Sequence, residues 1–441
     1  MKDFIKKIKD IYRHEELRAK IGFTLLLLLV YRIGSFIILP GIDSSQLDAG
    51  SQGGILAFLG LFTGGAFSRA SIFALGVMPY ISASIVIQLL GLAVPTIQKL
   101  QKEGESGRKK INQWTRFLTI LIAVVQAPSY ITQYVPQGAH PEGFGWIFSS
   151  VVILTCSTLF VMWLGEKITD KGIGNGTSLI IMIGIISDIP RGIYTEATTQ
   201  TLFFFLIELA FLIIVIGAVV AITVAVRRIP VQMARMAQSS GHLPQGEGAR
   251  NYIPLKVNSA GVMPIIFAQA IMFVPALLQN NESFRDSKIL QSLTDFTGVG
   301  YNVLLFTMII LFTFFYTAIV TNPNQIADDL KRNGNFVPGI KPGKPTAEFI
   351  DRVLSNITLP GGIFVGLVAI LPALVMMVGL TKSQMFGQFF GGTSLLITVG
   401  VMLDLLQQIE SHLLSRHYDG LMKSGRMRGR NVSPVSTGYT G

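Results

Sequence analysis

Ten apolar runs, each near the length of one bilayer-spanning helix, constrain this chain more than any other feature of its sequence. A helix needs about 20 mostly apolar residues to cross the hydrocarbon core of a membrane. Only 14% of the residues are charged, whereas soluble domains carry about 25%. The sequence therefore predicts an all-α polytopic membrane protein with both termini on the same side. The predicted spans are 21–39, 72–94, 117–135, 146–164, 173–189, 202–226, 260–278, 301–320, 357–380 and 393–414.

The basic residues predict which side faces the cytoplasm. Thirty of the 36 Lys and Arg residues lie in the two termini and in the loops 95–116, 165–172, 227–256 and 323–356. Five lie in the alternate loops, and Arg32 lies inside the first span. Loops rich in Lys and Arg stay in the cytoplasm, so we expect both termini there. The net charge of +11 then follows from topology and from attraction to anionic lipids, and says little about nucleic acid.

The first apolar run follows a basic N-terminus, as the apolar core of a signal peptide does. The run is longer than such a core and no small-residue cleavage site follows it. Arg32 interrupts it and Pro40 ends it. We therefore expect a retained first span. The single cysteine, Cys156, excludes a disulfide framework within the chain.

Residues 60–94 join a glycine-rich apolar segment to the second predicted span. The part from Leu61 to Ser71 is too short and too rich in glycine to cross a bilayer, yet it is more apolar than an ordinary loop. Irregular backbone at membrane depth is tolerated where protein or a water-filled cavity surrounds it. Pro79 should break the helix that follows. These features predict a pore with a segment folded into it.

One face of the second span carries the clearest pattern. Helical spacing places Val77, Ile81, Ser84 and Gln88 on this face, so that it changes from branched aliphatic to polar toward the cytoplasm. An aliphatic constriction beside a polar funnel is typical of a pore that gates by dewetting. A helix that simply packs on its neighbours would show the same pattern, and both interpretations stay open.

A short motif occurs twice in the chain. Gly76–Ile81 and Gly261–Ile266 agree at five of six positions. The copies lie in the second and seventh spans, and an odd offset of five spans reverses the direction of the helix. The two halves would then form an inverted repeat, an arrangement that places the translocation path at the interface of the repeats.

The sequence offers no catalytic or cofactor-binding motif. The five histidines show no ligand spacing, and Gly339–Thr346 lacks the glycine spacing of a phosphate loop. We therefore expect no enzymatic activity, no cofactor and no metal. Arg32, Glu208 and Asp404 lie inside spans and are functional candidates by default. A solute or ion transporter built on such groups, and a membrane insertase without a through-pore, are the alternatives to a pore that conducts polypeptide.

Six motifs, spread over almost the whole chain and in order, resemble bacterial SecY, the channel subunit of the general secretion translocon. They are Tyr31–Phe36, Gly104–Arg108, Gly165–Gly176, Leu255–Gly261, Phe336–Ile340 and Gly391–Leu396. The resemblance implies ten transmembrane helices in two pseudo-symmetric, inverted five-helix halves around an hourglass pore with a plug segment. It also implies gated conduction of unfolded polypeptides across the bacterial plasma membrane and lateral release of hydrophobic helices into the bilayer.

The same resemblance divides the chain into four parts. Residues 1–20 would be a cytoplasmic amphipathic N-terminus, 21–190 the N-terminal half and 191–414 the C-terminal half. Residues 415–441 would be a basic cytoplasmic tail. The implied partners are SecE and SecG, the motor ATPase SecA, the ribosome, signal sequences and unfolded preproteins, YidC and accessory Sec subunits, and anionic lipids.

The resemblance further assigns roles to single residues. The pore ring carries over onto Val77, Ile81, Thr177, Ile181, Ile266 and Ile397. The plug corresponds to Leu61, Phe62, Thr63, Gly64, Gly65, Ala66, Phe67, Ser68 and Arg69, with Arg69 toward the outside. The lateral gate would include Ser84, Gln88 and Asn258. Docking of SecA or the ribosome would use Arg250, Lys256, Lys331, Arg332, Lys341 and Lys344.

Several positions depart from the pattern of the family. Many relatives carry isoleucine at the positions of Val77 and Thr177, so we expect a slightly wider or wetter constriction here, and less ion leak in Thr177→Ile. Relatives often carry arginine at the positions of Asn324 and Lys341. A lysine keeps the charge but loses the bidentate fork of arginine.

Overall fold

The computed structural model describes residues 14–43, 60, 63–135, 137–141, 143–233, 251–279, 292–293, 295 and 297–423. Ten long helices in this part of the chain carry the ten predicted spans. They are α2 (Glu15–Gly34), α4 (Met78–Ala93), α6 (Glu105–Tyr134), α7 (Phe144–Lys171), α8 (Gly176–Thr199), α9 (Leu202–Val224), α10 (Met263–Gln279), α12 (Val299–Val320), α14 (Lys344–Met377) and α16 (Gly392–Lys423). The short helices are α5 (Pro95–Lys102), α13 (Pro323–Arg332), α15 (Gln384–Gly387), η2 (Gln137–Ala139) and η4 (Gln388–Phe390).

Seven of the described helices are long and apolar enough to cross a membrane by themselves, and the bent pair of α4 and α5 raises this number to eight. The other two predicted spans are helical but less regular. Helix α2 begins with a charged turn, and α10 has 17 residues. The fold is therefore that of a polytopic helical membrane protein, as the apolar runs predicted.

The first predicted span is shifted toward the N-terminus. Helix α2 begins at Glu15, where the acidic side chains of its first turn favour the positive end of the helix dipole, and it ends at Gly34. Residues 35–39, expected to be helical, instead lead into a pairing with the segment before α4. The Leu39 N–H donates to the Ala70 carbonyl, and the Ile72 N–H donates to the Ile37 carbonyl, both at 2.9 Å.

The second predicted span is shorter than expected. Residues 72–77 form turns, and α4 begins at Met78 with Pro79 in its first turn. Pro79 therefore starts the helix instead of breaking it, because a proline at that position gives up no intrahelical hydrogen bond. Gly76 before it adopts φ +51°, and Gly261 adopts φ +64° before α10, which begins at Met263. Both copies of the repeated motif thus have the same local structure.

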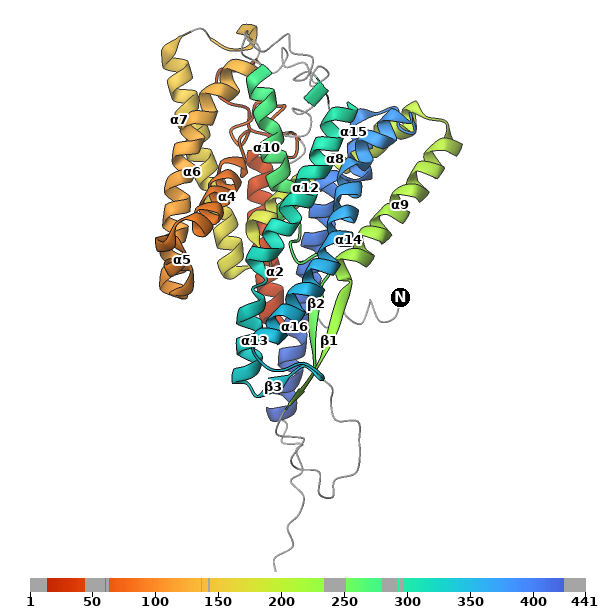
Figure 1. Cartoon of the computed structure of the whole chain (residues 1–441). Coiled ribbons are helices and arrows are strands. Elements are labelled where there is room, and N and C mark those ends of the chain that lie inside the picture. The colour runs from red at the N-terminus through yellow and green to blue at the C-terminus, as the bar shows by residue number, and fades with distance from the viewer. Residues whose placement is uncertain are drawn as a thin grey trace, which may run out of the picture.

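The two long loops predicted to be cytoplasmic join in one small sheet. Strands β1 (Val226–Met233) and β2 (Asn251–Lys256) form an antiparallel hairpin, and β3 (Asn335–Phe336) adds to the other edge of β1. A buried apolar cluster fixes the sheet on the start of α14, which begins 13 residues before the span predicted at 357–380. Figure 1 shows the sheet, α5 and α13 toward one end of the molecule and α15 toward the other.

Two large buried clusters form the interior. The first joins α2, α7 and α8, and the second joins α9, α10, α12 and α14. Helix α16 belongs to both, because Ile397 and Val401 pack in the first cluster whereas Leu396 and Val399 pack in the second. The last span thus packs with helices of the first half of the chain, α8 above all, as well as with those of the second.

The connection between the two halves is very short. Helix α8 continues past Pro190 to Thr199, ten residues beyond the predicted span, and α9 begins at Leu202. The predicted boundary at residue 190 therefore falls inside a helix. The two residues between α8 and α9, Gln200 and Thr201, join the halves.

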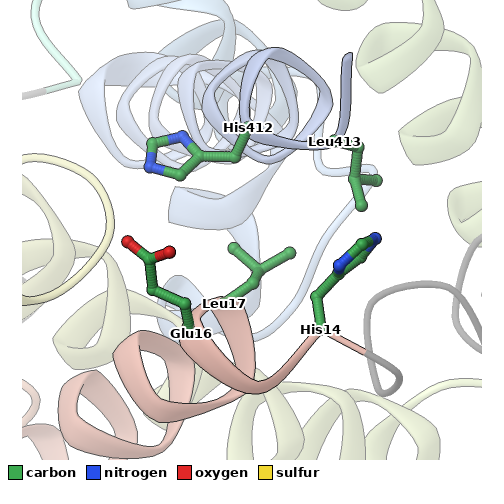
Figure 2. A pocket seen from close by; sticks show the side chains of 5 residues that line it. All are labelled: His14, Glu16, Leu17, His412 and Leu413. Atoms are coloured by element: carbon green, nitrogen blue, oxygen red, sulfur yellow. The ribbon is translucent and has the colours of Figure 1, made fainter. Parts of the chain in front are cut away.

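The first and last spans meet at the end of the molecule that carries the sheet. The start of α2 and the end of α16 line a small hollow between His14, Glu16, Leu17, His412 and Leu413, as Figure 2 shows. Beside it, the Lys20 ammonium lies 3.3 Å from Nε2 of His412 and 3.7 Å from the Glu16 carboxylate. The contact between Lys20 and His412 joins the ends of the two helices, whereas the contact between Lys20 and Glu16 lies within α2.

Candidate functional site

Four of the six predicted pore-ring residues come together. Val77, Ile181 and Ile397 are buried in one hydrophobic cluster, and Ile81 packs against it. These residues come from the start of α4, from α8 and from α16, three elements far apart in sequence. Val77, Ile181 and Ile397 are no more than 6% exposed. Branched aliphatic side chains from three distant elements are therefore packed together at this level of the molecule.

The other two predicted ring residues lie elsewhere. Thr177 is in the first turn of α8, where its hydroxyl donates to Oδ1 of the N-cap Asn175 at 2.7 Å. Its methyl group lies beside Gly165 of α7. Ile266, in the first turns of α10, is half-buried outside the cluster that holds Val77. The expected effect of Thr177→Ile on leak stays a prediction, and the described hydroxyl is already held by the helix cap.

The segment before α4 folds as a series of turns rather than as a loop. Its predicted plug residues Leu61 and Phe62 lie outside the described residues. The hydroxyl of Thr63 accepts from the Phe67 N–H at 3.1 Å and donates to the Gly60 carbonyl at 3.2 Å. The Gly65 N–H also donates to the Gly60 carbonyl. These short-range bonds satisfy a backbone that has no helix or sheet partners, which a buried irregular segment requires.

Two arginines hold this segment by one carbonyl oxygen. Nη1 of Arg32 on α2 donates to the Gly64 carbonyl at 3.0 Å, and Nη2 of Arg69 donates to the same oxygen at 2.7 Å. Both guanidinium groups also lie over the ring of Phe36, at 4.9 and 4.5 Å from its centre. The Arg69 side chain thus folds back on its own segment. Charged donors make the stronger kind of hydrogen bond to a carbonyl.

Asp188 of α8 supplies the opposing charge for these arginines. Its side chain is 8% exposed and interacts electrostatically with Arg32, Arg69 and Arg191. Two guanidinium groups on one carbonyl would repel each other, and a buried carboxylate between helices offsets that repulsion. Asp188 lies near the end of the predicted span 173–189. The rule that singled out Arg32 as an ionisable residue inside a span therefore also identifies Asp188.

Gly64 lies too close to α8 for any side chain. A Cβ atom there would come within 2.9 Å of the Cα of Gly184 and of Oγ of Ser187. The residue also adopts φ +61°, which favours glycine. The segment thus touches α8 by its backbone, one helical turn from Ile181 of the closed cluster.

Tyr130 of α6 anchors the other end of the segment. Its hydroxyl donates to the Phe67 carbonyl at 2.7 Å, and its ring meets that of Phe67 edge-on at 4.8 Å. Tyr134, one turn further along α6, packs against the same phenylalanine at 5.1 Å. Sequence reasoning missed Tyr130, because a tyrosine in an apolar span has no local signal that points to a partner 63 residues away.

The predicted lateral-gate residues are partly brought together. Nε2 of Gln88 donates to Oγ of Ser84 at 3.4 Å, so these two polar side chains share one face of α4, as the spacing predicted. Asn258 lies in the turns between β2 and α10 and is half-buried. Helix α4 packs on α6, so the second and third predicted spans are neighbours. Helix α10 packs on α12, so the seventh and eighth are neighbours as well.

The predicted docking residues lie around the small sheet. Lys256 ends β2, Lys331 and Arg332 form the last turn of α13, and Lys344 begins α14. These four and Lys341 are exposed, and Arg250 lies outside the described residues. The sequence predicted two separate docking loops. The pairing of β1 with β3 brings the two loops, and their basic residues, together at one sheet.

The ionisable residues singled out inside spans form no common site. Arg32 binds the Gly64 carbonyl, Glu208 accepts from Gln200, and Asp404 is exposed on α16. In the described part of the chain, no three His, Cys, Asp or Glu side chains gather as a metal site would require. Among the described residues, these three ionisable side chains therefore do not come together at the level of the aliphatic cluster.

Comparison with known proteins gives a consistent result. Residues 71–406 match the family model of SecY. The protein translocase subunit SecY of Thermus thermophilus is 42% identical over 438 residues, which cover 94% of this chain and 97% of the relative. The range matched by the family model contains Val77, Ile81, Ile181 and Ile397 of the aliphatic cluster and the three strands of the sheet.

Two solved structures share the fold. One is a SecY whose plug domain is described as stabilising the closed state of the translocation channel. It has a TM-score of 0.57 and 18% identity, and covers 92% of this chain and 94% of its own. The other is Sec61 in a canine ribosome–channel complex from the endoplasmic reticulum, with a TM-score of 0.57 and 17% identity over the same shares. At these identities the likeness concerns the fold alone.

Proposed function

The chain belongs to the SecY family, and on that premise we propose that it is the channel subunit of a protein translocase. It conducts unfolded polypeptide across the bacterial plasma membrane and releases apolar helices sideways into the lipid. An extended polypeptide cannot cross hydrocarbon, because each unpaired backbone polar group costs several kcal/mol, on the order of 2–7. A multi-pass helical protein that opens a water-filled path removes this cost, because water can then pair with the backbone of the crossing polypeptide.

The packing of Val77, Ile181 and Ile397 with Ile81 carries the proposal. A conduit for polypeptides must accept almost any side chain and still hold back ions. Branched aliphatic side chains fit that task, because they offer no specific hydrogen bonds and exclude water when they meet. Their shared cluster supports a constriction that is closed in this state. Ile266 and Thr177 would join the ring when the helices move.

The segment from Thr63 to Arg69 is the plug of this channel. Its support comes from Arg32, Arg69 and Tyr130, which hold its carbonyl groups. Removal of the segment should raise the leak of ions while translocation persists. A signal sequence and a docked partner would shift the channel toward the open form by binding that form more tightly.

The lateral gate lies between the pair of α4 with α6 and the pair of α10 with α12. Ser84 and Gln88 would face the cytoplasmic funnel, and Asn258 would lie at the start of α10. The support is the polar face of α4, which the hydrogen bond between Ser84 and Gln88 defines.

The basic surface around the sheet is the docking site for a ribosome or for the motor ATPase SecA. Lys256, Lys331, Arg332, Lys341 and Lys344 provide exposed positive charge there. A related channel, canine Sec61, is found in a ribosome complex, which supports a ribosome as one partner. SecE, SecG, YidC and accessory Sec subunits would bind the apolar outer faces of the helices, and anionic lipids would contact the basic side.

The basic side is the cytoplasmic side, with both termini on it. The division into halves then falls at Gln200–Thr201, where the connection between α8 and α9 is shortest. The N-terminal half carries the plug, and the C-terminal half carries both docking loops.

Reconstitution tests this function directly. Vesicles that contain the purified chain with its membrane partners and SecA should protect an added unfolded precursor from protease in an ATP-dependent manner. A precursor that stays accessible to protease, while the same vesicles take up a solute, would favour the transporter alternative. Protection of membrane-protein segments alone would favour the insertase alternative.

A further inference from the structure

A pair of buried carboxylates lies where the two halves of the chain are joined. Glu196, near the end of α8, is 0% exposed, and Glu208, in the second turn of α9, is 1% exposed. The two interact electrostatically. Neither takes part in the constriction or holds the plug. Burial of two carboxylates of like charge costs free energy unless each has hydrogen-bond partners or is neutralised by a proton.

Glu196 is fully compensated by the backbone. Its Oε1 accepts from the Lys382 N–H at 3.0 Å, and its Oε2 accepts from the Ser383 N–H at 2.8 Å. Residues 380–383 connect α14 to α15 and belong to the second half of the chain. Glu196 thus ties the last helix of the first half to a loop of the second half, and its negative charge is stabilised by two N–H donors.

Glu208 is not compensated in this way. Its Oε1 accepts from Nε2 of Gln200 at 3.0 Å, whereas its Oε2 is buried with no hydrogen-bond partner. Gln200 also donates to the Leu380 carbonyl at 3.1 Å. The next residue, Thr381, has a buried hydroxyl that likewise lacks a partner. Two orphaned oxygens therefore belong to the same junction.

The surroundings of Glu208 are otherwise apolar. Phe205, Phe211 and Leu212 lie three or four residues away on the same face of α9. Phe205 packs on Phe386, and Phe211 stacks on Phe390. Among the described residues no Lys, Arg or His side chain pairs with either carboxylate, since the ion pairs of that part of the chain join Lys20 with Glu16, Lys109 with Glu105 and Arg116 with Glu166.

We propose that Glu208 binds a proton in this state and that the neutral acid closes the junction between α8, α9 and residues 380–383. A proton fits better than a metal ion. Both oxygens of Glu196 are already occupied, and a Ca²⁺ ion, for example, takes about six to eight oxygen ligands. One proton on Oε2 removes the uncompensated charge and the like-charge repulsion with Glu196. The ionisable group that acts on Glu208 is Glu196 from α8. From the loop, Lys382 contributes its backbone N–H to Glu196, and its side chain is exposed.

The proton couples the junction to pH. If the halves separate and water reaches Glu208, the acid loses its proton, so that the closed form binds more protons than the open one. Low pH on the exposed side then favours the closed form, and high pH favours opening. This consequence for gating rests on the proposed function, whereas the bound proton itself does not.

Infrared difference spectroscopy tests the bound proton. The unmodified protein should show the C=O stretch of a protonated carboxyl group, which shifts when its glutamates carry a ¹³C carboxyl label. The isosteric variant Glu208→Gln should lose this band. The control Glu166→Gln should keep it, since Glu166 forms a bidentate ion pair with Arg116. A band that is absent from the unmodified protein, or unchanged in Glu208→Gln, would overturn the proposal.

Thermal unfolding across the neutral range provides the second readout. The unmodified protein should lose stability as pH rises, because the native junction holds a proton that an unfolded chain releases. Glu208→Gln should lose this dependence, and Glu166→Gln should retain it. Equal slopes for the unmodified protein and Glu208→Gln would contradict the proposal. Precursor crosslinking in the same variants separates this result from a failure of the channel function, since Glu208 lies outside the constriction.

Discussion

Arg32 on α2 donates a hydrogen bond from Nη1 to the carbonyl oxygen of Gly64, 3.0 Å away. This bond links the first span to the segment that lies against the aliphatic cluster. Since Arg69 holds the same oxygen from within the segment, Arg32 is the side chain that ties the Gly64 carbonyl to a surrounding helix, as Tyr130 ties the Phe67 carbonyl to α6. The closed state should therefore depend on Arg32 more than on other external basic residues.

Replacement of Arg32 by methionine should raise ion leak through the resting channel. A hydrogen bond from a charged donor contributes about 1.5–3 kcal/mol, and about 1.4 kcal/mol changes a population tenfold. We expect about a tenfold larger open fraction, measured as conductance of planar bilayers that contain the closed channel. Lys382→Met, an exposed basic residue of the junction loop, is the control. Leak that stays at the unmodified level in Arg32→Met would count against the assigned contact.

Gly64→Ala should also disturb the plug, for a different reason. Alanine in the left-handed conformation costs about 1–2 kcal/mol, and its Cβ would collide with the backbone of Gly184. We expect a leak at least as large as that of Arg32→Met and a plug that proteases cut faster. Gly22→Ala is the matched control, because a Cβ at that helical glycine meets nothing within 4 Å. Equal protease sensitivity of the two variants would mean that Gly64 is not packed as described.

The sequence predicted the helical spans well because each is an apolar run, and apolarity over the length of a bilayer leaves few alternatives to a helix. The prediction was less accurate at the ends of the helices. The end of α2 at Gly34 depends on pairing with Ala70 and Ile72, and the start of α4 depends on the conformation of Gly76. Pro79 carried a usable signal, since prolines favour the first turn of a helix.

The site was predictable where it depends on helical spacing. Spacing placed Val77 and Ile81 on one face. They lie in one cluster with Ile181 and Ile397, which only the resemblance had grouped with them. Contacts between distant segments gave no such signal. The pairing of β1 with β3 joins residues more than a hundred positions apart, and β1 contains a proline that argues against a strand. The roles of Tyr130 and Asp188 likewise appear only when α6 and α8 are placed beside the plug.

Tyr130→Phe should weaken the anchor of the plug on α6. The variant loses the hydroxyl that donates to the Phe67 carbonyl but keeps the ring contact. That carbonyl also accepts from the Ala70 N–H at 3.3 Å, so the loss should be near the typical net value of about 1 kcal/mol. We expect a several-fold rise in leak, measured as above. In Tyr134→Phe, whose hydroxyl shows no bond to the described plug residues, leak should stay unchanged, and equal leak in the two variants would contradict the assignment.

Charge reversal at Lys331 and Arg332 should slow the docking of ribosomes. Both side chains are exposed in the last turn of α13. Complementary charge raises association rates, and salt screens the effect. We expect a slower association at low salt, a smaller difference at high salt and little change in leak, measured by ribosome binding to vesicles. Lys382→Glu serves as the control, and a loss of binding of the same size in that variant would remove the argument for the sheet surface.

The most direct test of the account is photo-crosslinking from the constriction to a stalled precursor. A photo-reactive side chain at Ile81 or Ile266 should crosslink to a secretory precursor that is held in transit, whereas one at Ile213, which is 62% exposed on the outer face of α9, should not. Crosslinks from Ile81 and Ile266 are expected, and they should disappear when the precursor is released. An engaged precursor that crosslinks at neither position would contradict the claim that polypeptide passes through this ring.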